Sequence, residues 1–333
     1  MTDARRMLRP AAPSRRDLLR LAALAPALSL AAPLRALALG PAPADQAPGW
    51  FRFMLGETEI TICSDGALKT PTTLLGVNAP REEVAAYLAA HHLDAQTNYA
   101  HTNHVVIRRG QRVALVDLGS GSRWQATAGR LTRNMQAAGL APDEVTDVFV
   151  THAHPDHIWG AMDDFDEPLM VNAQHRIGAD ERAFWMQEGL IDRVEPQMQQ
   201  FVVGARNAIE ALGDQLTDIA PDEELAPGMR AVATPGHTAG HMSLLVEDPS
   251  GAGLLALGDA MNHALISVER PDWHFGFDAD REMAARTRRA LLARAADEGL
   301  VVVGYHFPFP GVGHIIREGE GFRFLPALWR WPE

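Results

Sequence analysis

The stretch THAHPDHIWG, from Thr151 to Gly160, limits what this chain can fold into more than any other part of its sequence. Three histidines and one aspartate lie within the six residues from His152 to His157. A solvated loop gains nothing from such crowding, and a core would be destabilised by so many buried polar groups. Imidazoles and carboxylates are good ligands for Zn²⁺ and similar ions, so the stretch predicts a metal site if the rest of the chain supplies more ligands.

The predicted site lies at the end of a strand. Val148–Thr151 is a β-branched run that favours a strand, and α/β folds place their sites at strand ends because the backbone is rigid there. Pro155 fixes its own φ and stiffens the loop. His152 and His154, two residues apart, can converge on one ion, and Asp156 and His157 then point toward a second.

Three further ligands are expected from distant loops of the same kind. His237 lies in TPGHTAGH, Asp259 in LLALGDA and His306 in VVVGYHFPFPGVGH. In each string the ligand lies near the end of a predicted strand, and the string contains Gly or Pro residues that are typical of turns. One such loop could arise by chance, but four in one chain argue against a purely structural role.

Strands and helices alternate along the whole chain, which predicts one α/β domain over residues 45–333. Short β-rich runs predict the strands, and helical patterns between them predict the helices. The predicted strands are Glu59–Ser64, His104–Ile107, Arg112–Val116, Val148–Thr151, Met229–Thr234, Met242–Glu247, Gly253–Leu257 and Leu300–Val303. The predicted helices are Arg81–Ala90, Arg123–Ala138, Phe201–Leu212 and Asp280–Glu298.

Residues 1–44 are predicted to be a signal peptide and leader of the twin-arginine type. Arg15 and Arg16 precede an apolar run from Leu21 to Leu34, which is short for a membrane span, and small residues that suit cleavage follow. A periplasmic or secreted protein is therefore expected, with no stable membrane insertion after processing. A disordered basic leader and a membrane anchor are the alternatives.

Charge and cysteine content exclude several roles. The net charge of −12 and the lack of a basic stripe beyond residue 40 argue against a nucleic-acid partner. The single cysteine, Cys63, allows no disulfide within the chain. Its apolar surroundings, Ile60-Thr61-Ile62, predict a buried strand residue rather than a nucleophile.

Taken together, His-x-His-x-Asp-His, Gly-His, Gly-Asp and a late His resemble the metallo-β-lactamase fold superfamily, and LVDLGSG at 115–121 looks like its early Asp-x-Gly turn. The resemblance runs from about Phe51 to the C-terminus. SDG at 64–66, GRL at 129–131 and PGVGHI at 310–315 look most similar to the group of methyl parathion hydrolase and related exported lactonases. This resemblance implies an αβ/βα sandwich with a dinuclear metal site at the edge of the sheets.

Carried over residue by residue, the resemblance implies two metal sites. His152, His154 and His237 would hold the first ion, Asp156, His157 and His306 the second, and Asp259 would bridge them. Zinc is the first expectation, and manganese, cobalt and iron accept the same ligands. Two such ions acidify a bridging water to hydroxide, and Asp259 is a candidate catalytic group that takes up its proton. No sulfur ligand lies near Asp259, which argues against β-lactam hydrolysis.

Four other residues are candidates for supporting or lining the site. Asp117 could orient a ligand imidazole or simply belong to a turn. His241 resembles a supporting position, with a packing histidine as the alternative. Trp124 and Trp185 fall by resemblance near an aromatic pocket, with ordinary core packing as the alternative.

The predicted function is hydrolysis of a small molecule, namely a lactone, an aryl ester or a phosphotriester, by the metal-bridging hydroxide. The alternative is a mononuclear iron oxidoreductase on the same fold, of the persulfide dioxygenase type, and a non-catalytic binding protein is a third hypothesis. The resemblance also admits a homodimer, although the sequence shows no clear interface stripe.

Overall fold

A computed structural model describes residues 49–328. The chain divides into the units Met1–Ala38 and Leu39–Glu333, and the described residues belong to the second. The predicted leader lies outside the described residues, so its cleavage, the export of the chain and the domain boundary after residue 44 stay predictions. No helix within residues 49–328 is long and apolar enough to cross a membrane.

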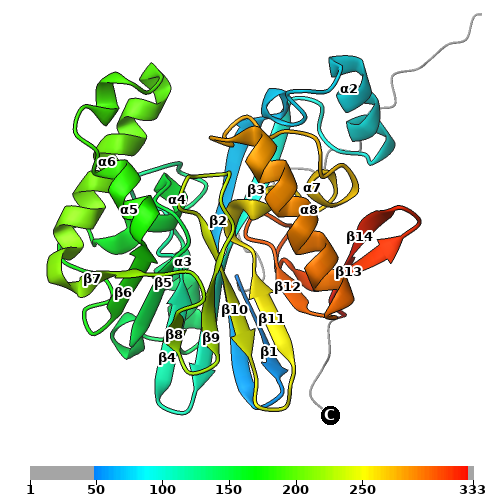
Figure 1. Cartoon of the computed structure of the whole chain (residues 1–333). Coiled ribbons are helices and arrows are strands. Elements are labelled where there is room, and N and C mark those ends of the chain that lie inside the picture. The colour runs from blue at the N-terminus through cyan, green and yellow to red at the C-terminus, as the bar shows by residue number, and fades with distance from the viewer. Residues whose placement is uncertain (1–48, 329–333) are drawn as a thin grey trace, which may run out of the picture. The chain divides into compact units, whose positions relative to one another are not determined.

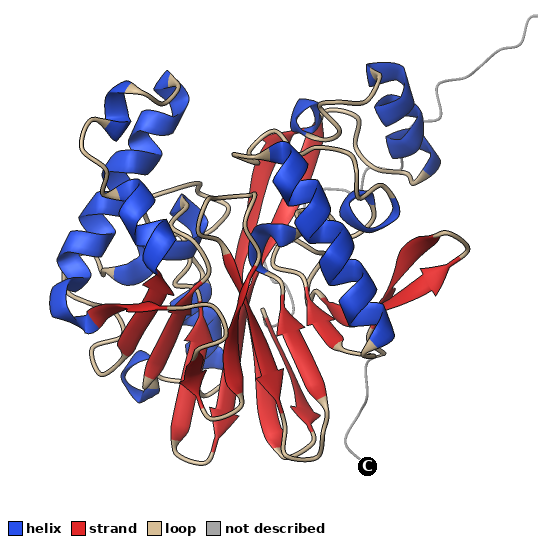
Figure 2. Ribbon diagram, viewed as in Figure 1, coloured by secondary structure: helices blue, strands red, loops and turns tan. Residues whose placement is uncertain are grey.

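Two seven-stranded sheets form the centre of this unit, and the helices lie outside them (Figure 2). The first sheet has the order β1 (Trp50–Leu55), β2 (Thr58–Pro71), β3 (Thr97–Arg109), β4 (Arg112–Val116), β5 (Asp147–Val150), β6 (Gln174–Gly178) and β7 (Leu216–Ile219). The second has the order β14 (Gly321–Pro326), β13 (Val312–Glu318), β12 (Val301–Val303), β11 (Gly253–Ala256), β10 (Met242–Glu247), β9 (Met229–Ala233) and β8 (Glu224–Ala226).

The helices form the outer layers. In Figure 1, α5 and α6 cover the first sheet and α8 covers the second. The helices are α2 (Arg81–Ala90), α3 (Leu131–Ala137), α4 (Pro155–Ile158), α5 (Ala179–Trp185), α6 (Pro196–Leu212), α7 (Ile266–Glu269) and α8 (Arg281–Asp297). The αβ/βα sandwich expected from the sequence is thereby confirmed.

The hydrophobic core has three layers, one between the two sheets and one between each sheet and its helices. Side chains that point alternately to the two faces of a strand contribute to two of these layers. In β5, Val148 and Val150 pack against the helices of the first sheet, whereas Phe149 packs between the sheets. In β10, Leu244 faces the other sheet and Leu245 faces α8. Because successive strand side chains point to opposite faces, a continuous apolar run serves both cores.

Strand pairing brings the predicted ligand loops to one edge. β4, β5, β6 and β7 pair in parallel, as do β11 and β12. The carboxyl ends of parallel neighbours meet at the same edge of a sheet, so residues that follow β4, β5, β11 and β12 can share one site.

One predicted helix is shorter than the sequence suggested. The prediction of a helix over Arg123–Ala138 was wrong for its first half, since α3 begins at Leu131. The preceding segment bonds to β2 instead: Ala67 N–H donates to the Thr127 carbonyl at 3.1 Å, and Gln125 Oε1 accepts from Lys69 N–H at 2.8 Å. Gly129, at φ +79°, then turns the chain into the helix.

The strand prediction was incomplete. β2 and β3 extend well beyond their predicted ranges, and β1, β6, β7, β8, β13 and β14 were not expected. The remaining predicted strands agree with the structure to within two residues.

Cys63 is expected to resist thiol reagents in the folded protein. Its side chain is fully buried in β2, and burial raises the pKa of its thiol to about 12. The reactive thiolate is therefore nearly absent at neutral pH. A chromogenic disulfide reagent should titrate no thiol before a denaturant is added and one thiol afterwards; rapid reaction of the native protein would contradict this placement.

His175 is expected to make the protein acid-sensitive. It is fully buried in β6, and burial lowers the pKa of its imidazole from 6.5 to about 4. The unfolded chain therefore takes up the proton first, so the stability that the neutral ring provides is present above pH 6.5 and is lost as the pH falls toward 4. The loss is about 3 kcal/mol. Urea unfolding at pH 7 and pH 4 should show a smaller loss in His175→Leu than in the wild type; an equal loss would contradict the prediction.

Candidate metal centre

Four loops at strand ends bring the predicted ligands together. His152 and His154 follow β5, and α4, which begins at Pro155, carries Asp156 and His157. His237 follows β9, Asp259 lies in the 3₁₀ turn after β11, and His306 follows β12. All seven side chains are at least nine-tenths buried. Proline suits the first turn of α4 because an N–H there would have no partner within the helix.

Three histidines form the first half of the cluster. His154 Nδ1 lies 3.0 Å from His152 Nε2 and 3.0 Å from His237 Nε2. Ligand atoms held ~2.1 Å from a tetrahedral zinc ion lie ~3.4 Å from one another, so the three nitrogens are spaced for one ion.

The second half contains Asp156, His157 and His306, whose ligand atoms lie within 4.8 Å of one another. His157 Nε2 lies 3.4 Å from Asp156 Oδ2, and both atoms are buried without a hydrogen-bond partner among the described residues. Such buried, unpaired polar atoms are costly unless something else satisfies them. A cation between them would do so, and the residues present therefore fit a metal ion.

Asp259 lies between the two halves. Its Oδ2 is 3.3 Å from His237 Nε2 of the first half and 3.1 Å from His306 Nε2 of the second. Its Oδ1 is 3.3 Å from His157 Nε2 and has no hydrogen-bond partner in the described part of the chain. A carboxylate placed in this way can contribute an oxygen to each half.

In four of the five candidate ligand histidines, the ring nitrogen that faces away from the cluster contacts an oxygen atom. His157 Nδ1 lies 2.8 Å from Asp117 Oδ2 and His306 Nδ1 lies 2.8 Å from the His101 carbonyl. The remaining two pairs are His152 Nδ1 with Thr151 Oγ1 at 3.1 Å and His237 Nδ1 with Asp278 Oδ1 at 3.0 Å. These contacts fix each ring so that its other nitrogen faces the cluster.

Asp117 lies between the His157 ring and the start of the His152 loop. It contacts the His157 ring and also accepts hydrogen bonds from the Thr151 N–H at 2.7 Å and the Thr151 hydroxyl. Its φ of +61° lies in the left-handed region, which is uncommon for residues other than glycine but which aspartate enters more readily than most. The left-handed conformation turns the chain after β4 while its carboxylate holds the start of the His152 loop.

His241 supports the cluster without lying in either half. Its Nε2 accepts a hydrogen bond from the Asp259 N–H at 2.9 Å, and its Nδ1 lies 2.7 Å from the Thr234 hydroxyl. Burial lowers the pKa of His241 to about 3, so the ring stays neutral and Nε2 stays an acceptor. His241 therefore holds the backbone of the turn that carries Asp259.

The two halves differ in their electrostatics. Burial and the neighbouring imidazoles lower the pKa of His152 and His154 well below the usual range, which keeps both rings in the neutral form that binds metals. Burial also acts on His157 and His306, but the carboxylates of Asp156 and Asp259 outweigh it and raise their pKa. The carboxylates make the second half attractive to a cation.

No sequence pattern pointed to the ion pair that contacts His237. Asp278 contacts that ring and is itself bound by Arg288 of α8, whose Nη2 lies 3.1 Å from Asp278 Oδ2. Both side chains of the pair are at most 1% exposed. Asp278 lies 41 residues from His237 in a segment without a motif, so spacing could not have found it.

Aromatic rings flank the three-histidine half. Phe201 lies 5.6 Å from the His154 ring and 5.3 Å from Trp124, and Phe275 stacks on His237 at 6.4 Å. Trp124 is half-buried in this group, and its place near an aromatic pocket stays a prediction. Trp185 is only 2% exposed and packs edge-on to His154 at 5.7 Å, which places it behind the ligand rather than on an open wall.

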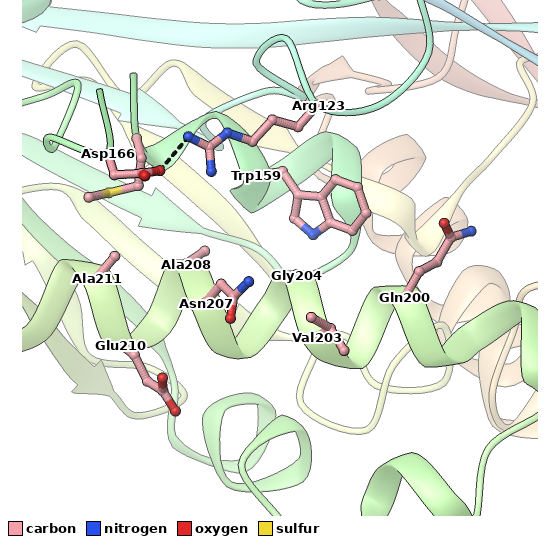
Figure 3. A pocket seen from close by; sticks show the side chains of 11 residues that line it. Arg123, Trp159, Asp166, Gln200, Val203, Gly204, Asn207, Ala208, Glu210 and Ala211 are labelled. Atoms are coloured by element: carbon pink, nitrogen blue, oxygen red, sulfur yellow. Dashed lines mark hydrogen bonds and ion pairs between the residues drawn. The ribbon is translucent and has the colours of Figure 1, made fainter. Parts of the chain in front are cut away.

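A groove of about 830 Å³ lies between α6 and the segment that contains Trp159 and Asp166 (Figure 3). None of the seven candidate ligands lines it. Trp159 forms one wall and packs edge-on against Trp124 at 5.3 Å. Gly204 lets Trp159 lie against α6, because a Cβ there would lie 2.2 Å from the indole.

Comparison with known sequences agrees with this geometry. The family model of the Metallo-beta-lactamase superfamily matches residues 99–306. N-acyl homoserine lactonase AiiA of Bacillus thuringiensis subsp. kurstaki is 25% identical over 198 residues, which are 59% of this chain and 66% of that protein. The match thus spans just under two thirds of the lactonase. Metallo-beta-lactamase domain-containing protein 1 of Xenopus laevis is 26% identical over 63% of this chain and 73% of its own length.

Solved structures share the fold. AidC, described as a dizinc quorum-quenching lactonase, superposes with a TM-score of 0.80 at 24% identity and covers 85% of this chain and 98% of its own. The hydrolase AbOPH has the same TM-score and identity and covers 86% of this chain and 100% of its own. The family model covers well over half of the chain, and its match includes all seven candidate ligands from His152 to His306; the chain belongs to the metallo-beta-lactamase superfamily.

Proposed function

We propose that this chain is a metal-dependent hydrolase that holds two divalent ions, zinc first among them, and opens the ester bond of a lactone. The position of Asp259 carries the proposal, because its two oxygens reach ligand nitrogens of both halves of the cluster. Two kinds of relative support it: AidC is described as a dizinc lactonase and AiiA as an N-acyl homoserine lactonase.

One ion would be held by His152, His154 and His237. The other would be held by Asp156, His157 and His306, and Asp259 would bind both ions. When bound, such ions acidify a water molecule and polarise an ester carbonyl. The protein contributes fixed geometry: the rings are held by Thr151, Asp117, Asp278 and the His101 carbonyl. Asp259 Oδ1, free of other hydrogen bonds among the described residues, is the proposed proton acceptor when the water is consumed.

The flanking rings indicate the kind of substrate. Beside the first half of the cluster, the Phe277 ring lies 6.3 Å from Phe201 and 5.7 Å from Phe275, and Phe201 lies next to Trp124. Aromatic walls around a polar reacting centre favour substrates that carry an apolar group. An acyl chain on a lactone meets this requirement, and so does the aryl group of an aryl ester or a phosphotriester.

The test compares substrates side by side. Purified, zinc-loaded protein is given an N-acyl homoserine lactone, an aryl ester and a dialkyl aryl phosphate, and kcat/KM is measured for each, with Asp259→Asn as the blank. The proposal expects the highest kcat/KM on the lactone. A preference for the phosphate would replace the lactone by a phosphotriester as the substrate, and no turnover above the blank on any of them would refute the hydrolase.

The leader motivates a separate proposal of periplasmic or secreted location. Its support is the pair Arg15-Arg16 before an apolar run of signal-peptide length. Fractionation of cells that express the wild type or an Arg15→Lys/Arg16→Lys variant tests it; equal export of both would rule out the twin-arginine route.

A further inference from the structure

Glu181 is a fully buried carboxylate that the proposed reaction does not use. It lies in the first turn of α5 and is 0% exposed. Among residues 49–328, no arginine, lysine or histidine forms an ion pair with it. A buried carboxylate is costly unless several hydrogen bonds satisfy it, so its partners show what it is for.

Four donors surround this carboxylate. Oε1 accepts from the Ala153 N–H at 3.0 Å and from the Trp185 indole N–H at 2.6 Å. Oε2 accepts from the Thr238 hydroxyl at 2.5 Å and from the Gly240 N–H at 3.1 Å. Hydrogen bonds to an ionised acceptor are roughly twice as strong as neutral ones, so the four together form a firm anchor.

The two oxygens fasten two different ligand loops to each other. Ala153 stands between His152 and His154, and Thr238 directly follows His237. One carboxylate thus joins the loops that carry all three histidines of the first half. None of the four donors belongs to the loops of Asp259 or His306. His157 shares the loop of Ala153, but its ring is held separately by Asp117, as the His306 ring is held by the His101 carbonyl.

Two glycines allow the loop after His237 to approach the start of α5 closely enough for these hydrogen bonds. A Cβ on Gly240 would lie 2.1 Å from the Glu181 nitrogen, so only glycine lets the loop after His237 approach the start of α5. A Cβ on Gly178, just before α5, would lie 2.9 Å from the Gly240 carbonyl oxygen. The glycine of TAGH in the sequence therefore has a packing reason beyond turn formation.

We propose that Glu181 is a positioning residue that holds the His152–His154 loop and the His237 loop at metal-binding distance, and so sets the affinity of the three-histidine half without setting that of the other. This inference rests on the proposed two-metal function. Loss of a group that orients metal ligands typically lowers metal affinity by about 10- to 100-fold.

The test measures the two metal affinities separately. Metal-free full-length protein is titrated with Zn²⁺ in competition with a chromophoric chelator, for the wild type and for Glu181→Gln. The glutamine amide has only one oxygen, so its NH₂ group would face two hydrogen-bond donors, either those of Ala153 and Trp185 or those of Thr238 and Gly240, and those two bonds would be lost. We expect one of the two affinities to fall by about 10- to 100-fold and the other to stay within about twofold.

Reference variants identify which half is affected. His237→Ala removes a ligand of the first half and His306→Ala a ligand of the second. Glu181→Gln should weaken the affinity that His237→Ala abolishes. Wild-type affinity at both sites, equal weakening of both, or weakening of the His306 site alone would overturn the inference. A wild type that binds no Zn²⁺ would overturn the proposed function itself, which is a distinguishable outcome.

Thr238 keeps the inference testable if Glu181→Gln fails to fold. Thr238→Val removes one of the four hydrogen bonds with little change of shape, whereas Thr238→Ser keeps the hydroxyl. The first site should weaken in Thr238→Val and recover in Thr238→Ser. A purely structural role would lower the melting temperature of the metal-free protein in Thr238→Val without this site-selective pattern, and that result would also overturn the inference.

Discussion

Asp259→Asn is expected to lower kcat/KM on the preferred lactone by about 10³-fold, equivalent to about 4 kcal/mol of transition-state stabilisation. Asparagine has nearly the same shape, but it carries no charge and one of its two oxygens becomes an NH₂ group. It therefore cannot offer oxygens both to His237 of the first half and to His157 of the second, each of which Asp259 reaches at 3.3 Å. Initial rates over a range of lactone concentrations, with metal content measured on the same samples, check this.

A matched control separates this effect from a general loss of charge. Asp297 is exposed and pairs with Arg317 at 2.8 Å on the surface, so Asp297→Asn should leave kcat/KM within about twofold of the wild type. If Asp259→Asn kept most of its activity while still binding both metals, the bridging role of this carboxylate would be wrong.

Arg288→Met is expected to destabilise the metal-free protein by about 3–5 kcal/mol. The guanidinium is 1% exposed and pairs with a carboxylate, Asp278, that is fully buried. Methionine fills similar space but leaves that charge without its partner. Three backbone carbonyls that Arg288 binds also lose their donor, namely those of Ala260, Pro271 and Trp273. Urea unfolding with a chelator present measures the loss without a contribution from bound metal.

The next residue in α8 supplies the control. Arg289 pairs with Asp272 on the surface, where both side chains are more than half exposed. Exposed pairs contribute about 0–1 kcal/mol, so Arg289→Met should change the free energy of unfolding by no more than that. A similar loss of unfolding free energy in Arg288→Met and Arg289→Met would show that the buried pair stabilises the protein no more than the exposed pair does.

The candidate ligands could be found from the sequence because each lies in a short string at the end of a strand. His152, His154, Asp156 and His157 share one loop, and the turns around His237, Asp259 and His306 carry Gly or Pro. The positions of β5, β9, β11 and β12 followed from apolar runs. These local signals suffice to place seven side chains at one edge of the sheets.

The supporting residues could not be found in this way, since their roles depend on contacts between distant segments. Glu181 meets Gly240 across 59 residues, and Asp278 meets His237 across 41. Neither lies in a recognisable string. The wrong start predicted for α3 has a similar cause: the pattern from Arg123 suits a helix, but hydrogen bonds to β2, far away in sequence, hold its first half in turns and loop.

The most direct test of the two-metal hydrolase is the metal content of the protein, measured by elemental analysis while Zn²⁺ is added stepwise to metal-free samples and lactone hydrolysis is followed. The account predicts two ions per chain at saturation, with activity reaching its maximum only as the second ion binds. One tightly held iron per chain, with no lactone hydrolysis at any zinc loading, would contradict it and would favour the mononuclear oxidoreductase.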